Sequence, residues 1–316
     1  MVHICNHHLA FPEQKEGVMI LITGANGRPG SAAVREFARH GTPVRALVRD
    51  PKKADDLRAL PGVDVRHGDM LWPETLESVL DGVDRVLMIS SAGPQMLETQ
   101  CTFIDAAIRA GVGHIVKFSG KDSIDGFDNE KFRSSRSHEQ IQRYLFASGM
   151  PWTVLQPSQF MQVYFEEVPD IVRSGELRLP LGDTTLAPID VEDIAKVAYA
   201  VLTTSGHGGR TYTMTGPDAL TMADAARHIS DAIGKPVRYR DVTSEEKQRA
   251  WIQAGYPPPR ASAFVQLFQE RKRLGRSTVD LTTHQHFGVE PTTFAEFARR
   301  NADIFRGATD YTVTPA

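Results

Sequence analysis

The sequence predicts an α/β protein built on a doubly wound parallel sheet, with a smaller C-terminal α/β lobe. Two observations support this fold class. Between Val18 and Gln156, six apolar runs of strand length alternate with five helical patterns. Repeated strand–helix units of this length favour a parallel sheet with helices on both faces. After Pro157 the alternation becomes irregular, which is typical of a second lobe placed over the carboxyl ends of the strands.

The first half of the chain supplies the strand–helix units of the sheet. Each expected strand is a short run rich in aliphatic residues, and each expected helix repeats its apolar residues at helical spacing. The strands are expected at Val18–Thr23, Pro43–Val48, Val63–His67, Arg85–Ile89, His114–Phe118 and Trp152–Gln156. The intervening helices are expected at Ser31–His40, Lys53–Leu60, Pro73–Leu80, Gln95–Ala110 and Ser134–Ser148.

The second half contains more helix than strand. Helices are expected at Val163–Ser174, Val191–Thr203, Met222–Ile233, Ser244–Ala254, Ala261–Leu274 and Thr293–Asn301. Short strands are expected at Leu177–Leu179, Thr211–Thr215 and Val237–Tyr239. The stretch from Gly255 to Pro259 is expected to be a loop between two helices, because its glycine and successive prolines interrupt the helical pattern.

Composition excludes several classes of function. A net charge of −3 over 316 residues gives no basic field for nucleic acid or for an anionic membrane. No apolar run is long enough to cross a bilayer. With two cysteines and no signal-peptide pattern, we expect a cytoplasmic protein. Near the N-terminus, His3, Cys5, His7 and His8 fit no closed zinc site. We therefore expect no metal, and a flexible extension over residues 1–17.

The most informative motif follows the first expected strand. Gly24, Gly27 and Gly30 stand at G-x-x-G-x-x-G spacing, and a helical pattern begins directly afterwards. Glycines permit a sharp turn and a close approach of the backbone to a ligand, and a helix N-terminus offers N–H groups to an anion. We therefore expect this turn to hold the pyrophosphate of a dinucleotide. Two interpretations of Arg28 are open, because it either reaches a phosphate or points into solvent.

The end of the second expected strand indicates which dinucleotide is bound. NAD-binding folds place an acidic residue roughly twenty residues after the glycine turn, where it binds the ribose. Here Arg49 comes first, and a guanidinium can bind a 2′-phosphate through two N–H groups. Lys52 adds positive charge. NADP(H) is therefore expected in preference to NAD(H). The alternatives are a solvated basic loop, or a ribose contact by Asp50.

Further candidates follow the third, fourth and fifth expected strands. Asp69 lies where adenine is usually held, or else caps the next helix. Ser90 and Ser91 are small enough for a cofactor to approach closely. Ser119 and Lys121 offer a hydroxyl and an ammonium near the expected nicotinamide. Lys121 is a candidate to orient a carbonyl or donate a proton, and the alternative is a solvated lysine.

Several motifs together resemble the NmrA-like family of atypical short-chain dehydrogenases/reductases. They are the glycine turn, Arg49, residues 118–120, the stretch from His138 to Met161, and residues 187–195, 212–217 and 291–298. The resemblance covers roughly Val18 to Phe305 and implies a Rossmann fold with a nicotinamide cofactor. The dinucleotide contacts expected from motif and resemblance together are Gly24, Asn26, Gly27, Arg28, Pro29, Gly30, Arg49, Lys52, Asp69, Met70, Ser90, Ser91, Ser119, Gly120, His138, Pro157, Ser158 and Phe160.

One departure from ordinary short-chain dehydrogenases concerns their Tyr-x-x-x-Lys acid/base pair. Its two positions fall on Ser134 and His138 in this chain, so neither the tyrosine nor the lysine is present. Relatives within the NmrA-like group often carry a histidine at the second position. His138 is therefore the candidate proton donor or nicotinamide-ribose contact. The alternative is a helix-face histidine without a catalytic role.

These residues predict an NADP-dependent reductase that transfers hydride to a small organic acceptor needing little acid catalysis. Quinones, azo or iminium groups and activated alkenes meet that description. The competing hypothesis is a non-catalytic NAD(P)-sensing regulator that acts through a protein partner, since the resembled family includes such members. We expect a Rossmann domain over residues 18–157 and a substrate lobe over 158–310, with some segments returning to the sheet, then a tail over 311–316. A monomer or homodimer is expected, with neither nucleic acid nor membrane as a partner.

Overall fold

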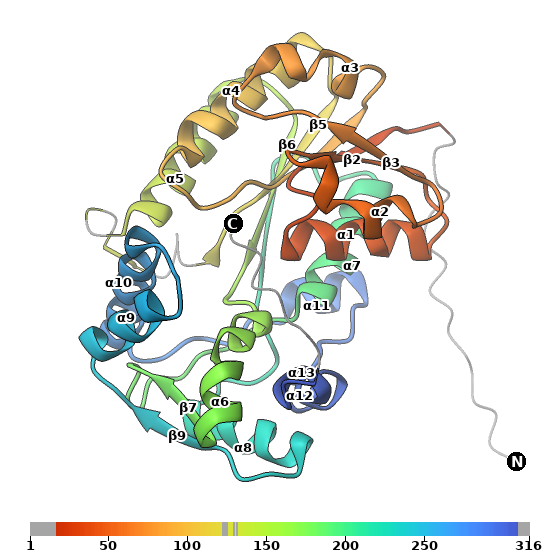
Figure 1. Ribbon diagram of the computed structural model, residues 1–316. Helices are drawn as coiled ribbons and strands as arrows, with labels where there is room; N and C mark the ends of the chain where they lie inside the picture. Colours follow the sequence, from red (N-terminus) through yellow and green to blue (C-terminus); the bar gives the residue numbers. More distant parts are fainter. Residues whose placement is uncertain (1–16, 122–125, 129, 131, 309–316) are drawn as a thin grey trace, which may run out of the picture.

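A computed structural model describes residues 17–121, 126–128, 130 and 132–308 of the chain. The expected extension before residue 17 and the expected tail at 311–316 lie outside the described residues. The main sheet has seven strands in the order β3-β2-β1-β4-β5-β6-β8, and every neighbouring pair is parallel. The expected fold class, a doubly wound parallel sheet, is therefore confirmed (Figure 1).

The strand order creates a crevice at the centre of the sheet. The strands are β1 (Ile20–Ile22), β2 (Val44–Val48), β3 (Val63–His67), β4 (Arg85–Met88), β5 (His114–Phe118), β6 (Trp152–Pro157) and β8 (Arg210–Met214). After β1 the chain moves outward through β2 and β3, then returns to place β4 on the other side of β1. Ligands bind at such a switch point, outside the carboxyl ends of the strands.

Two layers of helix cover the two faces of the sheet (Figure 1). Side chains alternate between the faces along each strand. Ile20 and Ile22 of β1 pack in one core with α1 (Arg28–Arg39) and α7 (Val191–Thr203). Leu21 points the other way, into a core shared with α3 (Glu77–Leu80), α4 (Met96–Arg109) and α5 (Arg133–Ala147). The alternation thus fixes which face each strand residue meets.

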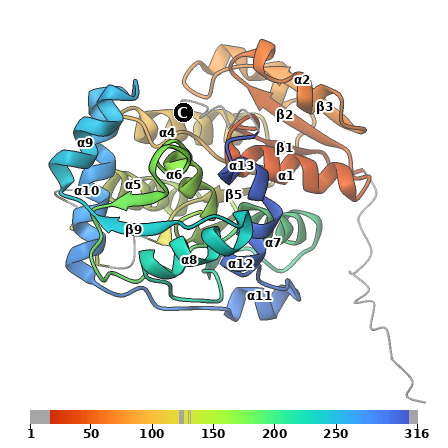
Figure 2. The ribbon, with the colours of Figure 1, turned by 60° about the horizontal axis from the view of Figure 1, so that its bottom comes forward.

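The C-terminal elements, several of which come forward in Figure 2, build a third core. A two-stranded parallel sheet pairs β7 (Glu176–Leu179) with β9 (Arg238–Asp241). The helical elements around it are η4 (Met161–Glu167), α6 (Val168–Ser174), α8 (Met222–Ile233), α9 (Ser244–Gln253), α10 (Pro258–Leu274), α12 (Phe294–Arg300) and α13 (Ala302–Phe305). By contrast, β8 and α7 belong to the main sheet and its covering layer, so the chain passes more than once between the main sheet and this third core.

Several expected helices differ from those observed. The helix expected at Lys53–Leu60 is a 3₁₀ turn, η1 (Pro51–Lys53), followed by the short α2 (Asp55–Arg58). The helix expected at Pro73–Leu80 is likewise split into η2 (Pro73–Thr75) and α3. Prolines begin both 3₁₀ turns, since proline needs no N–H partner in a first turn.

Proline also alters the second half of the chain. The helix expected at Val163–Ser174 divides into η4 and α6, with a proline in the first turn of α6. Helix α10 begins at Pro258 instead of Ala261, because the prolines expected in a loop occupy its first turn. Two short helices, α11 (Thr282–Phe287) and α13, were not expected from the sequence. Elements this short are held by tertiary packing more than by helical periodicity.

Candidate functional site

The glycine turn lies between β1 and α1, where steric crowding requires glycine. Gly24 has a φ of +59°, and a Cβ there would lie 2.9 Å from the carbonyl oxygen of Ile89. A Cβ on Gly30 would lie 2.2 Å from the carbonyl oxygen of Gly24. Helix α1 begins with Gly27 as its N-cap, without a side-chain hydrogen bond and with no acidic residue in the first turn. A compact turn ahead of an uncapped helix N-terminus fits the pyrophosphate of a dinucleotide.

Arg28 extends from this turn to the C-terminal lobe. Its Nη2 donates to Oε1 of Glu166 in η4 at 2.5 Å. The hydroxyl of Tyr256, which precedes α10, donates to the other oxygen of the same carboxylate. The interpretation that Arg28 points into solvent is therefore wrong. Glu166 instead connects the glycine turn of the sheet to the loop between α9 and α10.

The end of β2 presents Arg49 as an exposed side chain. The adjacent Asp50 accepts a hydrogen bond from the backbone N–H of Lys52 at 3.0 Å and thereby caps η1. One Asp50 oxygen is thus already engaged by the local backbone, whereas the Arg49 guanidinium extends from the end of the strand. Lys52 is also exposed on the same turn. This arrangement favours Arg49 over Asp50 as the group that meets the adenosine ribose.

Asp69 and Met70 follow β3. The Asp69 carboxylate accepts from the N–H of Leu71 at 2.9 Å, and its own N–H donates to the Thr75 hydroxyl at 2.9 Å. The interpretation that Asp69 caps the next helix is wrong, because η2 starts later, after Trp72. Asp69 shapes a tight turn instead, and Met70 is buried within it.

At the switch point, Ser90 and Ser91 directly follow β4. The Ser90 hydroxyl accepts a hydrogen bond from Nε2 of Gln100, a buried residue of α4, at 2.8 Å. Both serines are half-buried, so they remain partly accessible at the edge of the sheet. These small side chains lie near the carboxyl end of β4, the strand that pairs with β1, which the glycine turn follows.

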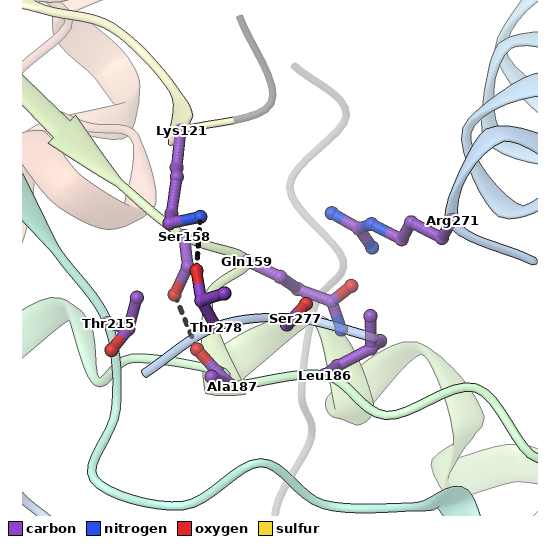
Figure 3. Close-up of a pocket in the computed structure, with 9 residues that line it drawn as sticks. All are labelled: Lys121, Ser158, Gln159, Leu186, Ala187, Thr215, Arg271, Ser277 and Thr278. Atoms are coloured by element: carbon purple, nitrogen blue, oxygen red, sulfur yellow. Dashed lines mark hydrogen bonds between the residues drawn. The ribbon is translucent and has the colours of Figure 1, made fainter. Parts of the chain in front are cut away.

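A small polar pocket lies where β5, β6 and β8 end (Figure 3). Lys121, Ser158 and Thr215 each come shortly after one of these strands, and Arg271 approaches from α10 on the opposite side. Nζ of Lys121 donates to the Thr278 hydroxyl at 3.3 Å. The described residues that line it are Lys121, Ser158, Gln159, Leu186, Ala187, Thr215, Arg271, Ser277 and Thr278. Among the described residues, the lining therefore contributes two cationic side chains and several hydroxyl groups, and no acidic residue.

Three of the predicted residues lie at or just after the end of β6. The Ser158 hydroxyl donates to the carbonyl of Ala187 at 2.6 Å, which fixes the turn after β6. Phe160 packs edge-on against Phe118 at the end of β5, with ring centroids 5.9 Å apart. Pro157 is the last, buried residue of β6. They lie at the carboxyl end of β6, next to the end of β5, the edge where a site is expected.

His138 lies on α5, one helical turn before Gln142. The side-chain amide of Gln142 donates to the Ser119 hydroxyl at 3.2 Å and to the carbonyl of His138 at 3.2 Å. Ser119 is buried at the end of β5, and His138 is half-buried. The structure thus brings the predicted Ser119 and His138 to the same strand end. Lys121 belongs to the neighbouring pocket and is not among the residues bonded to this pair.

The residue that sequence reasoning missed is Lys117 of β5. It is fully buried, and its Nζ lies 3.0 Å from Nδ1 of His138 and 3.2 Å from the carbonyl oxygen of Phe118. Because strand residues alternate, Lys117 shares the α4/α5 face with Ile115, whereas Val116 and Phe118 face α1 and α7. The available signal was a lysine inside a strand, two residues before Ser119. Side chains alternate between the two faces of the sheet, and helices cover both faces, so Lys117 cannot point into solvent.

Burial controls the ionisation of this pair. It lowers the pKa of Lys117 to about 7, while the Cys101 thiol of α4 acts in the opposite direction. The pKa of His138 is lowered well below its usual value, first by burial and then by the charge of Lys117. His138 is therefore neutral at physiological pH, and Lys117 titrates near neutrality.

No group of three or more metal-ligating side chains occurs among the described residues. Within the same part of the chain, no helix combines the length and apolar character needed to cross a bilayer.

A glycine turn and an uncapped helix N-terminus at the switch point of a parallel sheet define a dinucleotide-binding α/β protein. Comparison with known proteins agrees with this class. The model of the NmrA-like family matches residues 16–298, and the chain belongs to this family.

Its relatives include characterised reductases. The chain is 37% identical over 290 residues to the NAD(P)H azoreductase of Xenophilus azovorans, covering 92% of this chain and 100% of that protein. It is 33% identical to the (4-alkanoyl-5-oxo-2,5-dihydrofuran-3-yl)methyl phosphate reductase of Streptomyces griseus, covering 91% and 99% of the two chains. The NADPH-dependent quinone oxidoreductase QOR2 of Escherichia coli, solved with NADPH, superposes with a TM-score of 0.79 at 28% identity, covering 89% and 99%. The expected family and the class of NAD(P)H-dependent oxidoreductase are therefore confirmed.

Proposed function

We propose that this protein is an NADPH-dependent reductase that transfers hydride to a small organic acceptor of the quinone, azo, iminium or activated-alkene type. The observation that carries the proposal is that the glycine turn, the Ser119–His138 pair and the polar pocket all follow strands of one parallel sheet. A bound dinucleotide and an acceptor would therefore meet at the same edge. The names of the azoreductase and the quinone oxidoreductase support these acceptor classes.

The chain's own residues have separate roles in this scheme. The uncapped N–H groups of α1 would hold the pyrophosphate, and the nicotinamide supplies a hydride when the dinucleotide is bound. Ser119, held by Gln142, and His138 would contact the nicotinamide ribose or the acceptor. Lys121 and Arg271 would orient the acceptor through their charges. Because Ser134 stands where the tyrosine of the Tyr-x-x-x-Lys pair would be, His138 would be the proton donor at this strand end.

The preference for NADPH over NADH rests on Arg49. The exposed guanidinium at the end of β2 suits a 2′-phosphate, while Asp50 is engaged in capping η1. Replacing Arg49 with Ala should weaken NADPH binding at least about tenfold, the equivalent of about 1.4 kcal/mol, and leave NADH binding nearly unchanged. Fluorescence titration with both dinucleotides measures this. Arg35→Ala, an exposed charge on α1, is the matched control and should affect neither affinity. Equal losses for both dinucleotides in R49A would contradict the assignment.

Turnover is tested by NADPH consumption across a panel of quinones, azo compounds and enones. We expect oxidation with at least one class, and we expect His138→Ala to lower turnover more than NADPH affinity. If NADPH binds tightly but no acceptor is reduced, and a protein partner co-purifies, the chain is instead a dinucleotide-sensing regulator. A fully active H138A variant would remove His138 from the reaction.

A further inference from the structure

We propose that Lys117 and His138 form a proton relay in which Lys117 holds the proton that His138 delivers to the reduced acceptor. The inference rests on the proposed reductase function. It assigns Lys117, a side chain without access to solvent, as a positioning residue that acts through the half-buried His138.

The geometry fixes the orientation of the imidazole. An ammonium has only donors, so a charged Lys117 must donate to Nδ1 of His138 across the 3.0 Å contact. The imidazole proton is then on Nε2, the ring nitrogen on the side away from Lys117. Nζ of Lys117 also donates to the carbonyl oxygen of Phe118 at 3.2 Å, so Lys117 is held between two acceptors. His138 is thus presented as a neutral ring with an N–H available for donation.

A neutral imidazole alone is a poor acid, because losing Nε2–H would leave an imidazolate. Lys117 removes this difficulty. As the Nε2–H bond breaks and the proton moves to the anionic acceptor atom, an Nζ–H bond breaks and its proton moves to Nδ1. The acceptor has then gained one hydride from NADPH and one proton, while NADPH has become NADP⁺. His138 remains neutral as its other tautomer, and Lys117 becomes a neutral amine.

The surroundings of Lys117 suit a group that both holds and releases a proton. His138 of α5 and the Cys101 thiol of α4 are the titratable groups that face it, with Asp105 of α4 beyond the thiol. Burial places the pKa of Lys117 at about 7, so neither protonation state is strongly disfavoured near neutrality. A general acid works best when its pKa lies close to the working pH.

The choice of acceptor separates a relay from a structural role. A cationic acceptor, such as a triarylmethane or iminium ion, is fully reduced by hydride alone, whereas an azo group or enone also needs a proton. Lys117→Met keeps the length and apolar stem of the side chain but removes every donor. We expect K117M to lower kcat for an azo or enone acceptor about a hundredfold, within the usual range for general acids. Reduction of the cationic acceptor and NADPH affinity should change less than about threefold.

The pH profile gives a second readout. A general acid must carry its proton, so wild-type kcat for the azo or enone acceptor should fall as pH rises through about 7. In K117M this decline should disappear. His138→Gln, at a half-buried site, is a second variant should K117M fold poorly, and it should show the same division between acceptors. An equal loss for both acceptor types in both folded variants would overturn the relay.

A third readout does not depend on turnover. Nitrogen chemical shifts of the His138 ring, measured by NMR on the wild-type protein, report its tautomer directly. We expect the Nε2–H tautomer below neutrality, changing towards Nδ1–H as Lys117 loses its proton, without an imidazolium in that range. In K117M the ring should titrate to imidazolium at a higher pH than in the wild type. A wild-type His138 that titrates to imidazolium near 6.5 would refute the inference, whether or not any acceptor is reduced. If the proposed reductase function alone is wrong, the tautomer change of His138 should still be observed.

Discussion

A buried ion pair in the C-terminal lobe offers a quantitative test of what stabilises this fold. Nζ of Lys247 in α9 lies 2.5 Å from Oε2 of Glu167 in η4, with side chains 3% and 2% exposed. Lys247→Met removes the charge but keeps most of the volume, and it leaves the Glu167 carboxylate buried without its partner. Removing one partner of such a pair costs about 3–5 kcal/mol. We expect the free energy of unfolding at pH 8 to fall by that amount.

The loss should depend on pH in a defined direction. Burial raises the pKa of Glu167 from 4.5 to about 7 although the Lys247 ammonium opposes the rise, so without Lys247 the pKa should rise further. A carboxyl with a raised pKa in the folded chain adds stability below its unfolded pKa, and this stability is lost as pH rises through the folded value. The cost of K247M should therefore shrink from pH 8 towards pH 5, by at most about 1.4 kcal/mol per pH unit.

Urea unfolding followed by tryptophan fluorescence measures these changes, with the midpoint and slope determined at each pH. The matched control is Arg143→Gln, because Arg143 forms an exposed ion pair with Glu139 on α5, and the unfolding free energy should change by less than about 1 kcal/mol. The double variant Glu167→Gln/Lys247→Met should recover part of the loss, since no unpaired charge remains buried. A cost for K247M below about 1 kcal/mol at pH 8, or one unchanged at pH 5, would refute the reasoning.

Two further predictions concern the candidate site. Gly30→Ala would place its Cβ 2.2 Å from the Gly24 carbonyl oxygen, so the turn must distort, and NADPH should bind at least about tenfold more weakly by fluorescence titration. Gly208→Ala, where a Cβ meets nothing within 4 Å, is the control, and equal affinities in the two variants would count against the turn as the pyrophosphate site. Arg271→Met should raise KM for a sulfonated acceptor about tenfold more than for its neutral analogue, since Arg271 lines the pocket. Arg273→Met makes the same charge change on α10 outside the lining, and a matching rise there would show that the effect is not local to the pocket.

The sequence by itself determined the features that depend on residues close together in the chain. The bounds expected for Val191–Thr203 and Met222–Ile233 are those observed, because apolar periodicity and the capping residues Asp190 and Thr221 define these helices locally. The glycine turn was predictable for the same reason. The common edge of the candidate site followed from topology, since parallel strands joined by helices all end on the same side.

Only the tertiary structure decided which side chains meet at that edge. Lys117 and His138 are 21 residues apart, and Arg28 and Glu166 are 138 apart, so no local pattern relates the members of either pair. In the sequence, nothing distinguishes Lys117 from other strand residues. It lies buried beside the imidazole because α5 packs on the sheet. Burial removes the water that would otherwise solvate the ammonium, and this lowers its pKa into the range where a proton can be transferred. The sequence thus predicted the glycine turn as the place for a dinucleotide, and only the packing of α5 against β5 placed Lys117 beside His138.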